Sequence, residues 1–299
     1  MTQLDILDIN IPRKRIEEIK LSTQASLGVL KKFNVTHDKA LLYMTAGRSD
    51  GGTFSVREPI IESICSQVGE LFGFEIVRYK LWTIDKSLFY EIEDGEAAAI
   101  MPSAAVPENA SLGRTLSAAG RTLVSVSKSF RTKEEAFHSC DSLYANVHRR
   151  DLYARLTEDM GSEIIKRIDQ MILFDYIVNN TDRHMKNFGF IESKDGKLRM
   201  APLFDHGFSL TSRISEEDLE ECGMDALTHE PGQPFGSLVS SLGLISNSSL
   251  RGLNRNVKLS DLHGLIDKYD GIFSKTRISI MKSTLERGYH YVQKVLSKV

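Results

Sequence analysis

A short polar loop follows an apolar segment in the second half of the chain. Its sequence, NNTDRHMKNFGF (179–190), combines an acid, a base, an imidazole and amides. Local capping by short polar side chains explains Asn-Asn-Thr, but it leaves Asp-Arg-His-x-x-Asn without a reason. Asp182 and Asn187 are five positions apart, and Asp205 follows eighteen residues later, just before Gly207. Mg²⁺ prefers such oxygen ligands and often shares them with phosphates, so the pattern indicates phosphoryl transfer.

In such a site each of these side chains has a separate task. Asp182 would accept the proton of the attacking hydroxyl, while Asn187 and Asp205 would hold the metal against the phosphates. His184 would orient Asp182 or a phosphate, or it would only support the loop, and we favour support. A purely structural alternative has Asp182 capping the helix, Arg183 pairing with a nearby acid and Asn187 bonding to backbone. That alternative gives no reason for Asp205 to stand at the required place.

The surrounding pattern predicts the elements that must position this loop. The segment SEIIKRIDQMILFDYIV has apolar residues at helical spacing and predicts a helix over 162–180, followed by short strands in NFGFIES and GKLRMAPLFD. In the first third we expect a strand at 39–47, a helix through Ile60 to Leu71 that ends at Gly73, and two strands joined near Asp85. A strand at 123–126 comes next, after an Ala-, Ser-, Gly- and Pro-rich stretch (94–120) that we interpret as an excursion.

From Thr132 onward the pattern is mainly helical, with further helices expected at 133–147, 215–222, 259–268 and 274–297. A β-rich first part and a helical second part predict an α+β, bilobal, protein-kinase-like fold. We place the first lobe at 1–130 and the second at 131–299, with the ligand cleft between them.

The composition is that of an ordinary globular protein. The chain has 299 residues, 41% of them hydrophobic, and its 38 basic and 40 acidic side chains give a net charge of −2. This balance gives no reason to expect a nucleic-acid or membrane partner. The three cysteines have no C-x-x-C spacing, and no secretory signal or membrane-spanning run is evident, so we expect a cytoplasmic protein. Secretion as an effector stays open.

Several segments resemble one family. NNTDRHMKNFGF followed by LRMAPLFDHG resembles the catalytic segment of HipA-like serine/threonine kinases, and the compact size is similar to that of the short CtkA-type members. ESICSQVGELFGFEIV resembles the family's first-lobe helix, with Glu62 eleven residues before Gly73. LVSVSKSF resembles the strand that borders the adenine, which implicates Val126 and Ser127. GVLKK is a weaker match to the phosphate-side loop, through Gly28 and Lys31.

The resemblance implies a kinase that uses ATP and Mg²⁺ and transfers the γ-phosphate to serine or threonine hydroxyls of a protein. It also implies a bacterial toxin or effector and a regulatory partner such as an antitoxin. Phosphoinositide kinases share the Asp-Arg-His-x-x-Asn pattern, so a lipid or small-molecule kinase is an alternative. The acids in HGFSLTSRISEEDLEEC argue against a lipid surface.

One position departs from the family pattern. The strand that resembles LLYMTAG commonly carries a lysine that reaches the phosphates and pairs with the glutamate placed here at Glu62, whereas this chain has Met44. Phosphate neutralisation would then fall to magnesium and to Arg48 or Lys31. Three accounts compete: an engineered lysine-to-methionine change, which we favour, a nucleotide-binding pseudokinase, or a misplaced alignment. On the first account, Met44→Lys should raise phosphate transfer by more than roughly tenfold.

Overall fold

The computed structural model describes residues 6–9, 32–37, 40–50, 53–89, 111–227 and 234–298. Its strands are β1 (Ile6–Asp8), β2 (Lys32–His37), β3 (Ala40–Ala46), β4 (Ser49–Asp50), β5 (Thr53–Phe54), β6 (Lys80–Asp85), β7 (Arg121–Lys128), β8 (Ala136–Ser139), β9 (Gly189–Glu192) and β10 (Leu198–Met200). Its α-helices are α1 (Arg57–Phe72), α2 (Ser111–Ala118), α3 (Cys140–Tyr144), α4 (Arg149–Asp159), α5 (Ser162–Ile177), α6 (Glu216–Cys222), α7 (Leu238–Ser241), α8 (Leu259–Asp267) and α9 (Lys275–Leu296). Short 3₁₀ turns are η2 (Lys86–Phe89), η4 (Gly223–Ala226), η5 (Leu242–Leu244) and η6 (Asn247–Leu250).

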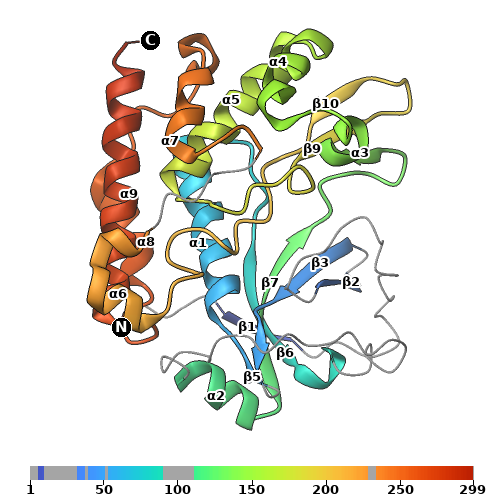
Figure 1. The fold of residues 1–299 in the computed structure, drawn as a ribbon. Coiled ribbons are helices and arrows are strands. Elements are labelled where there is room, and N and C mark those ends of the chain that lie inside the picture. Colours follow the sequence, from blue (N-terminus) through green and yellow to red (C-terminus); the bar gives the residue numbers. More distant parts are fainter. Residues whose placement is uncertain are drawn as a thin grey trace.

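The first lobe is built on a five-stranded sheet in the order β1-β6-β7-β3-β2 (Figure 1). Strand β3 runs antiparallel to β7, with Met44 opposite Val126 and Thr45 opposite Ser125. Successive side chains of a strand point to opposite faces, and directly opposed residues share a face. One face therefore carries an apolar cluster that includes Met44, Val126 and Trp82, and the other face carries the polar partners.

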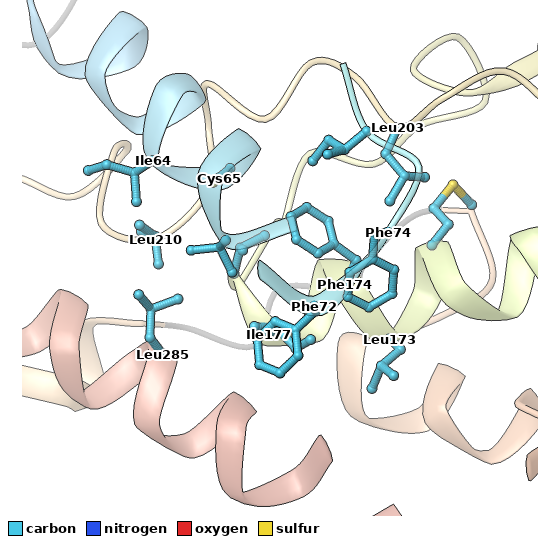
Figure 2. Packing of buried hydrophobic residues seen from close by; sticks show 14 of the residues in the cluster. Ile64, Cys65, Phe72, Phe74, Leu173, Phe174, Ile177, Leu203, Leu210 and Leu285 are labelled. Atoms are coloured by element: carbon cyan, nitrogen blue, oxygen red, sulfur yellow. The ribbon is translucent and has the colours of Figure 1, made fainter. Parts of the chain in front are cut away.

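Helix α1 lies between this sheet and the helices of the second lobe (Figure 1). It is buried on nearly all sides, as expected for a helix that packs against both lobes. Gly73 ends it in the left-handed conformation, with φ of 80°, as the sequence predicts. Beyond Gly73 the chain crosses to the second lobe, where Phe74 packs against Phe174 of α5 with ring centroids 5.1 Å apart (Figure 2).

The second lobe is centred on α5 and α9, and a single hydrophobic core joins both helices to α1 (Figure 2). Gly288 lets α9 approach α5 closely, because a Cβ at this position would lie 2.7 Å from the Cα of Ile177. The helices predicted over 162–180, 215–222, 259–268 and 274–297 are confirmed as α5, α6, α8 and α9. Helix α5 ends three residues earlier than predicted, at Ile177.

The helix predicted over 133–147 is wrong in its first half. Residues Ala136–Ser139 form β8, which pairs with β9 in a three-stranded sheet with β10, and only Cys140–Tyr144 form a helix. Pairing in the tertiary structure overrides the local helix preference here. Phe137 also packs edge-on against Phe130 and Phe204, with centroid distances of 5.6 and 5.8 Å.

Two predictions in the first lobe also differ from the structure. The strand expected after Asp85 begins instead as the 3₁₀ turn Lys86–Phe89, and the excursion expected over 94–120 contains helix α2 at Ser111–Ala118. The remaining part of that excursion lies outside the described residues. We keep the division of the lobes near residue 130 as a proposal.

Candidate active site

A cavity of about 620 Å³ lies between the two lobes. The first lobe contributes Tyr43 and Thr45 of β3 and Glu62 of α1, and the connecting segment contributes Ser127 and Phe130. From the second lobe come Lys186, Asn187, Phe204 and Asp205. The cavity thus brings Glu62, Ser127, Asn187 and Asp205 together, four residues that the sequence places up to 143 positions apart.

The loop that follows α5 is folded by its own hydrogen bonds. The backbone nitrogen of His184 donates to the carbonyl oxygen of Asp182 at 2.9 Å, and the Asn187 amide Nδ2 donates to the same oxygen at 3.1 Å. His184 Nδ1 accepts from the backbone nitrogen of Lys186 at 3.2 Å. These bonds fix the spacing between Asp182, Lys186 and Asn187. The supporting role of His184 stays a prediction.

Arg183 is the buried brace of this loop. Its side chain is about 1% exposed and binds Asp175 of α5 through two parallel bonds, both 2.9 Å long. Its Nη1 also donates to the carbonyl oxygens of Asn187, at 2.5 Å, and Phe204, at 2.9 Å. One guanidinium thereby ties the end of α5 to Asn187, one expected metal ligand, and to Phe204, which precedes the other. The expected pairing of Arg183 with a nearby acid is present, but it serves the loop as a whole.

His206 completes this buried network. Its Nε2 lies 2.7 Å from Arg183 Nη2, and because arginine only donates, this nitrogen is the acceptor of a neutral ring. Burial, together with the adjacent guanidinium of Arg183, lowers the pKa of His206 well below its ordinary value. The backbone nitrogen of His206 donates to Glu62 Oε1 at 3.3 Å, so Glu62 of α1 contacts the segment that carries Asp205.

Asp205 has a left-handed backbone, with φ of 61°, which a residue other than glycine adopts only where its surroundings impose it. Those surroundings are visible on both sides: Arg183 binds the carbonyl of Phe204, and Glu62 binds the nitrogen of His206. The Asp205 backbone nitrogen donates to the Tyr79 hydroxyl at 3.5 Å. Burial, then the charges of Glu62 and Asp205, raise the pKa of that hydroxyl well above the ordinary value. Asp205 lines the cavity.

Asp182 does not line the interlobe cavity, but its neighbours Thr181 and Arg213 line a second cavity. Burial raises the pKa of its carboxyl above the ordinary value, and Asp205 adds to the rise, whereas His184 and Arg213 oppose it. Arg213 Nη1 is 3.7 Å from Asp182 Oδ1, and Arg213 lines the second cavity, of about 460 Å³, together with Thr181 and Asp218 of α6. The role of Asp182 as a general base stays a prediction.

Several predicted nucleotide-binding residues lie elsewhere. Met44 and Val126 are buried in the apolar cluster on the far face of the sheet, and the structure does not bring them to the cavity. Their neighbours Tyr43, Thr45 and Ser127 line the cavity instead. Each is one position away along its strand, so its side chain points to the opposite face of the sheet. Gly28 and Lys31 lie outside the described residues.

Arg48 also lies away from the cavity lining. Its Nε donates to Glu58 Oε1 at 2.7 Å, its Nη2 donates to the Ser212 carbonyl at 3.4 Å, and its guanidinium lies 5.7 Å from the centroid of the Phe208 ring. The predicted phosphate-neutralising role of Arg48 is therefore not supported by its contacts.

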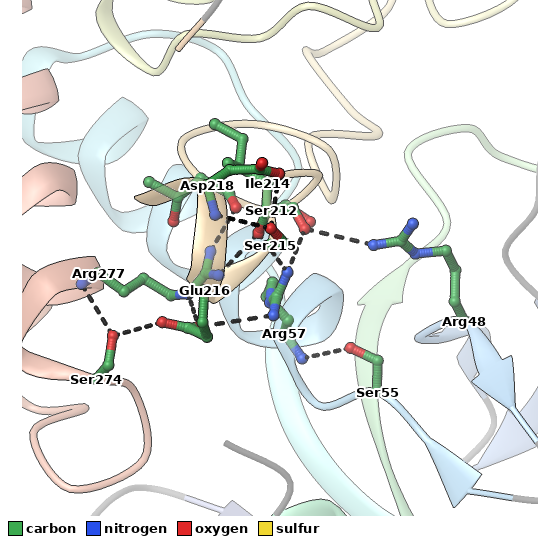
Figure 3. A network of polar contacts seen from close by, with 11 residues as sticks. Arg48, Ser55, Arg57, Ser212, Ile214, Ser215, Glu216, Asp218, Ser274 and Arg277 are labelled. Atoms are coloured by element: carbon green, nitrogen blue, oxygen red, sulfur yellow. Dashed lines mark hydrogen bonds and ion pairs between the residues drawn. The ribbon is translucent and has the colours of Figure 1, made fainter. Parts of the chain in front are cut away.

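A further network, which the sequence did not reveal, holds the segment 211–216 (Figure 3). Arg57 of α1 donates to the carbonyls of Ser212 and Ile214, both at 3.0 Å. Arg277 of α9 binds the carbonyls of Thr211 and Ile214 and the carboxylate of Glu216. We call residues 211–216 the tethered segment, because helices from both lobes hold it just beyond Asp205.

The donor set fits a magnesium ion only if phosphate completes it. In the described part of the chain, no three His, Cys, Asp or Glu side chains gather to hold a metal by themselves. Asn187 donates its amide nitrogen to the Asp182 carbonyl, which turns its oxygen Oδ1 away from that carbonyl, and Asp205 lines the same cavity. One amide oxygen and one carboxylate suit Mg²⁺, which keeps water or phosphate oxygens in its remaining positions.

Comparisons with known proteins give a family match and matches to solved structures. Residues 121–232 match the model of the family described as HipA-like C-terminal domain, a range that contains Asp182, Asn187 and Asp205. Among solved structures, the chain is similar to the Helicobacter pylori proinflammatory kinase CtkA, with a TM-score of 0.61, 12% identity and 96% of each chain covered. It also matches Shewanella oneidensis MR-1 HipA, solved with HipB and its operator DNA, with a TM-score of 0.40 and 11% identity over 96% of this chain and 67% of that one. No curated protein sequence matches.

The family-model match confirms the resemblance noted in the sequence, and the likeness to CtkA confirms the bilobal, kinase-like fold. The structural likeness to CtkA concerns the fold, since so few residues are identical. Across the described residues, no helix combines the length and the apolar composition that crossing a bilayer requires.

Proposed function

We propose that this member of the HipA-like kinase family is an ATP- and Mg²⁺-dependent kinase that phosphorylates serine or threonine hydroxyls of a protein. The observation that carries the proposal is the meeting of Asn187 and Asp205 in one interlobe cavity, with Asp182 close enough for Asp205 to raise its pKa. The adenine would lie along the connecting segment, beside Ser127 and Phe130, and the phosphates would lie toward Asn187 and Asp205.

The proposed chemistry uses the chain's own groups in three ways. Asn187 and Asp205 would hold Mg²⁺, which when bound neutralises phosphate charge. Asp182 would accept the proton of the attacking hydroxyl, which enters from the second cavity beside Arg213. Arg183 would keep these groups at fixed separations without touching substrate, because all its donors point to Asp175, His206 and backbone carbonyls.

The acceptor side favours a protein over a lipid. Helix α6 adjoins the second cavity through Asp218, and its solvent-facing residues include Glu217, Glu220 and Glu221. An anionic membrane would be repelled by this acidic surface. A regulatory partner such as an antitoxin, and a bacterial cytoplasmic setting, stay part of the proposal through the family resemblance.

Mutation of the base and of a metal ligand tests the proposal. The chain is incubated with labelled ATP, Mg²⁺ and a bacterial cell extract, and phosphopeptides are identified by mass spectrometry. We expect Asp182→Asn and Asp205→Asn to abolish transfer, with losses of at least about a hundredfold. Asp195→Asn, the same change in an exposed turn, is the matched control and should leave transfer intact. Equal transfer by all four proteins would refute the kinase assignment.

A nucleotide-binding pseudokinase is the second candidate, because β3 presents no basic side chain to the cavity. It predicts that the unmodified chain binds ATP in the presence of Mg²⁺ yet transfers no phosphate to any protein in the extract. Transfer that disappears in the Asp182→Asn variant would exclude it.

A further inference from the structure

The cavity needs positive charge at its phosphate end, and β3 does not supply it. The two residues that β3 turns toward the cavity are Tyr43 and Thr45, neither of which is basic, and Met44 lies on the opposite face. A triphosphate carries several negative charges, and charge-assisted bonds to its oxygens are among the stronger polar contacts in proteins. Beside Mg²⁺, we therefore expect another basic side chain of this chain to contact the phosphates if the cavity binds ATP as proposed.

Most basic side chains near the cavity are already engaged. Arg183 is buried against Asp175, Arg48 binds Glu58 and the Ser212 carbonyl, and Arg213 lines the other cavity beside Asp182. His138 lines the nucleotide cavity, but its Nε2 lies 2.8 Å from the carboxylate of Glu192. None of these four groups is placed to meet the phosphates.

Two basic side chains remain among the described residues that line the cavity, Arg131 and Lys186. Arg131 belongs to the connecting segment, next to Phe130, and donates to the carbonyl of Glu135 at 3.0 Å. That position is at the adenine end of the proposed nucleotide. Lys186 directly precedes Asn187, a predicted metal ligand, and is partly buried in the second-lobe wall.

We infer that Lys186 binds the terminal phosphate of the nucleotide and neutralises its charge in place of a lysine on β3. The inference rests on the proposed function. The backbone at this position is fixed, because the Lys186 nitrogen donates to His184 Nδ1 and the next residue is held by Arg183 through its carbonyl. The ammonium group therefore starts from a defined point beside Asn187, and His184 acts as its positioning residue.

Comparison of ATP with ADP isolates a contact to the terminal phosphate. Binding of adenosine, ADP and ATP is measured by calorimetry with Mg²⁺ present, on the unmodified chain and on Lys186→Met, Lys186→Arg and Lys194→Met. We expect Lys186→Met to weaken the binding of ATP by about tenfold or more and the binding of ADP by much less, while the binding of adenosine stays unchanged. Lys186→Arg should recover most of the ATP affinity because it keeps the charge, and Lys194→Met, in an exposed turn, should change nothing.

The outcomes separate this inference from the proposed function. If the unmodified chain binds no adenine nucleotide, both are refuted. If the unmodified chain binds ATP, the inference alone is refuted by either of two results: Lys186→Met weakens the binding of ATP and ADP equally, or it weakens the binding of neither. Parallel variants Arg131→Met and Lys31→Met complete the design: selective loss of ATP binding in one of them, with Lys186→Met normal, would assign the phosphate contact to that residue instead.

Discussion

Two networks of buried arginines hold the region around the candidate site, and they balance charge differently. Arg183 meets Asp175 in a two-bond pair, and although burial lowers its pKa, Asp175 raises it above the ordinary value overall. In the tethered segment, Arg57 and Arg277 share one carboxylate, Glu216. Burial, then the charge of Arg277, lowers the pKa of Arg57 to about 10, and burial also lowers the pKa of Arg277.

The difference indicates which network is the more rigid. Around Arg183 each charge has its own partner, so removal of the acid would leave a buried cation uncompensated. Around Glu216 two cations share one ion-pair partner, and the charge of Glu58 also raises the pKa of both arginines, so removal of one cation leaves the other compensated. We therefore expect the loop 179–187 to be the firmly fixed part and the tethered segment to be the part that opens more easily.

The largest effect is expected when the Arg183 pair is broken. Asp175→Asn should lower the free energy of unfolding by about 3–5 kcal/mol, because it leaves the Arg183 charge buried without an anion. The measurement is a urea denaturation curve, read together with phosphate transfer. Asp169→Asn is the matched control on the same helix: Asp169 is equally buried but accepts only from the Tyr153 hydroxyl and the Ser246 nitrogen. A similar loss in both variants would show that the Arg183 pair has no special weight.

A lysine placed at residue 44 would be a buried cation without any acidic partner, and it can be compared with the two arginine networks. Met44→Lys should lower the free energy of unfolding by about 2–4 kcal/mol, since residue 44 is fully enclosed among Leu42, Trp82 and other apolar side chains. Thr45→Lys, one position along β3, would extend into the cavity toward Glu62 and should cost less than about 1 kcal/mol. Thermal melts of the two variants compare them directly. Phosphate transfer restored in Met44→Lys would instead support the account that an engineered change replaced a lysine by Met44.

The smallest effect is expected in the tethered segment. Arg277→Gln should lower the free energy of unfolding by about 1–3 kcal/mol, because Glu216 keeps the Ser274 hydroxyl at 2.6 Å and Arg57 at 3.7 Å. Limited proteolysis should show faster cleavage within residues 211–216. Lys294→Gln, in an exposed position of the same helix, is the control. A loss larger than that of Asp175→Asn would reverse the ranking of the two networks.

Patterns among neighbouring residues of the sequence were enough to predict many of the helices and strands. The apolar spacing of α1 and α5, the stop at Gly73 and the order Asp182, Asn187, Asp205 are all features of neighbouring residues, and the structure brings Asn187 and Asp205 to one cavity. The function of these residues remains a proposal. The strand β3 was predicted, but the alternation of its side chains between the two faces was not applied to Met44. Leu42, Met44 and Ala46 alternate with Tyr43 and Thr45, and this pattern places Met44 in the core.

The rest depends on contacts between distant parts of the chain. Strand β8 exists because Phe137 meets β9 and the ring of Phe204, which no local pattern around residue 137 records. The brace of Arg183 needs Asp175, Phe204 and His206 to converge, and the tethered segment needs helices that are more than 200 residues apart in the sequence. Nothing in the sequence around these arginines distinguishes a buried arginine from the many exposed charged residues of a globular chain.

The tethered segment is gripped mainly by its main chain. Arg57 and Arg277 bind the carbonyls of residues 211, 212 and 214, which every amino acid provides, and Glu216 is the one side chain on which both arginines depend. Thr211 and Ser212 are fully buried and constrained by packing, whereas the exposed Arg213 can change without loosening these backbone contacts. Arg213, which faces the second cavity, belongs to this stretch, so homologues could acquire new acceptor preferences there at little structural cost.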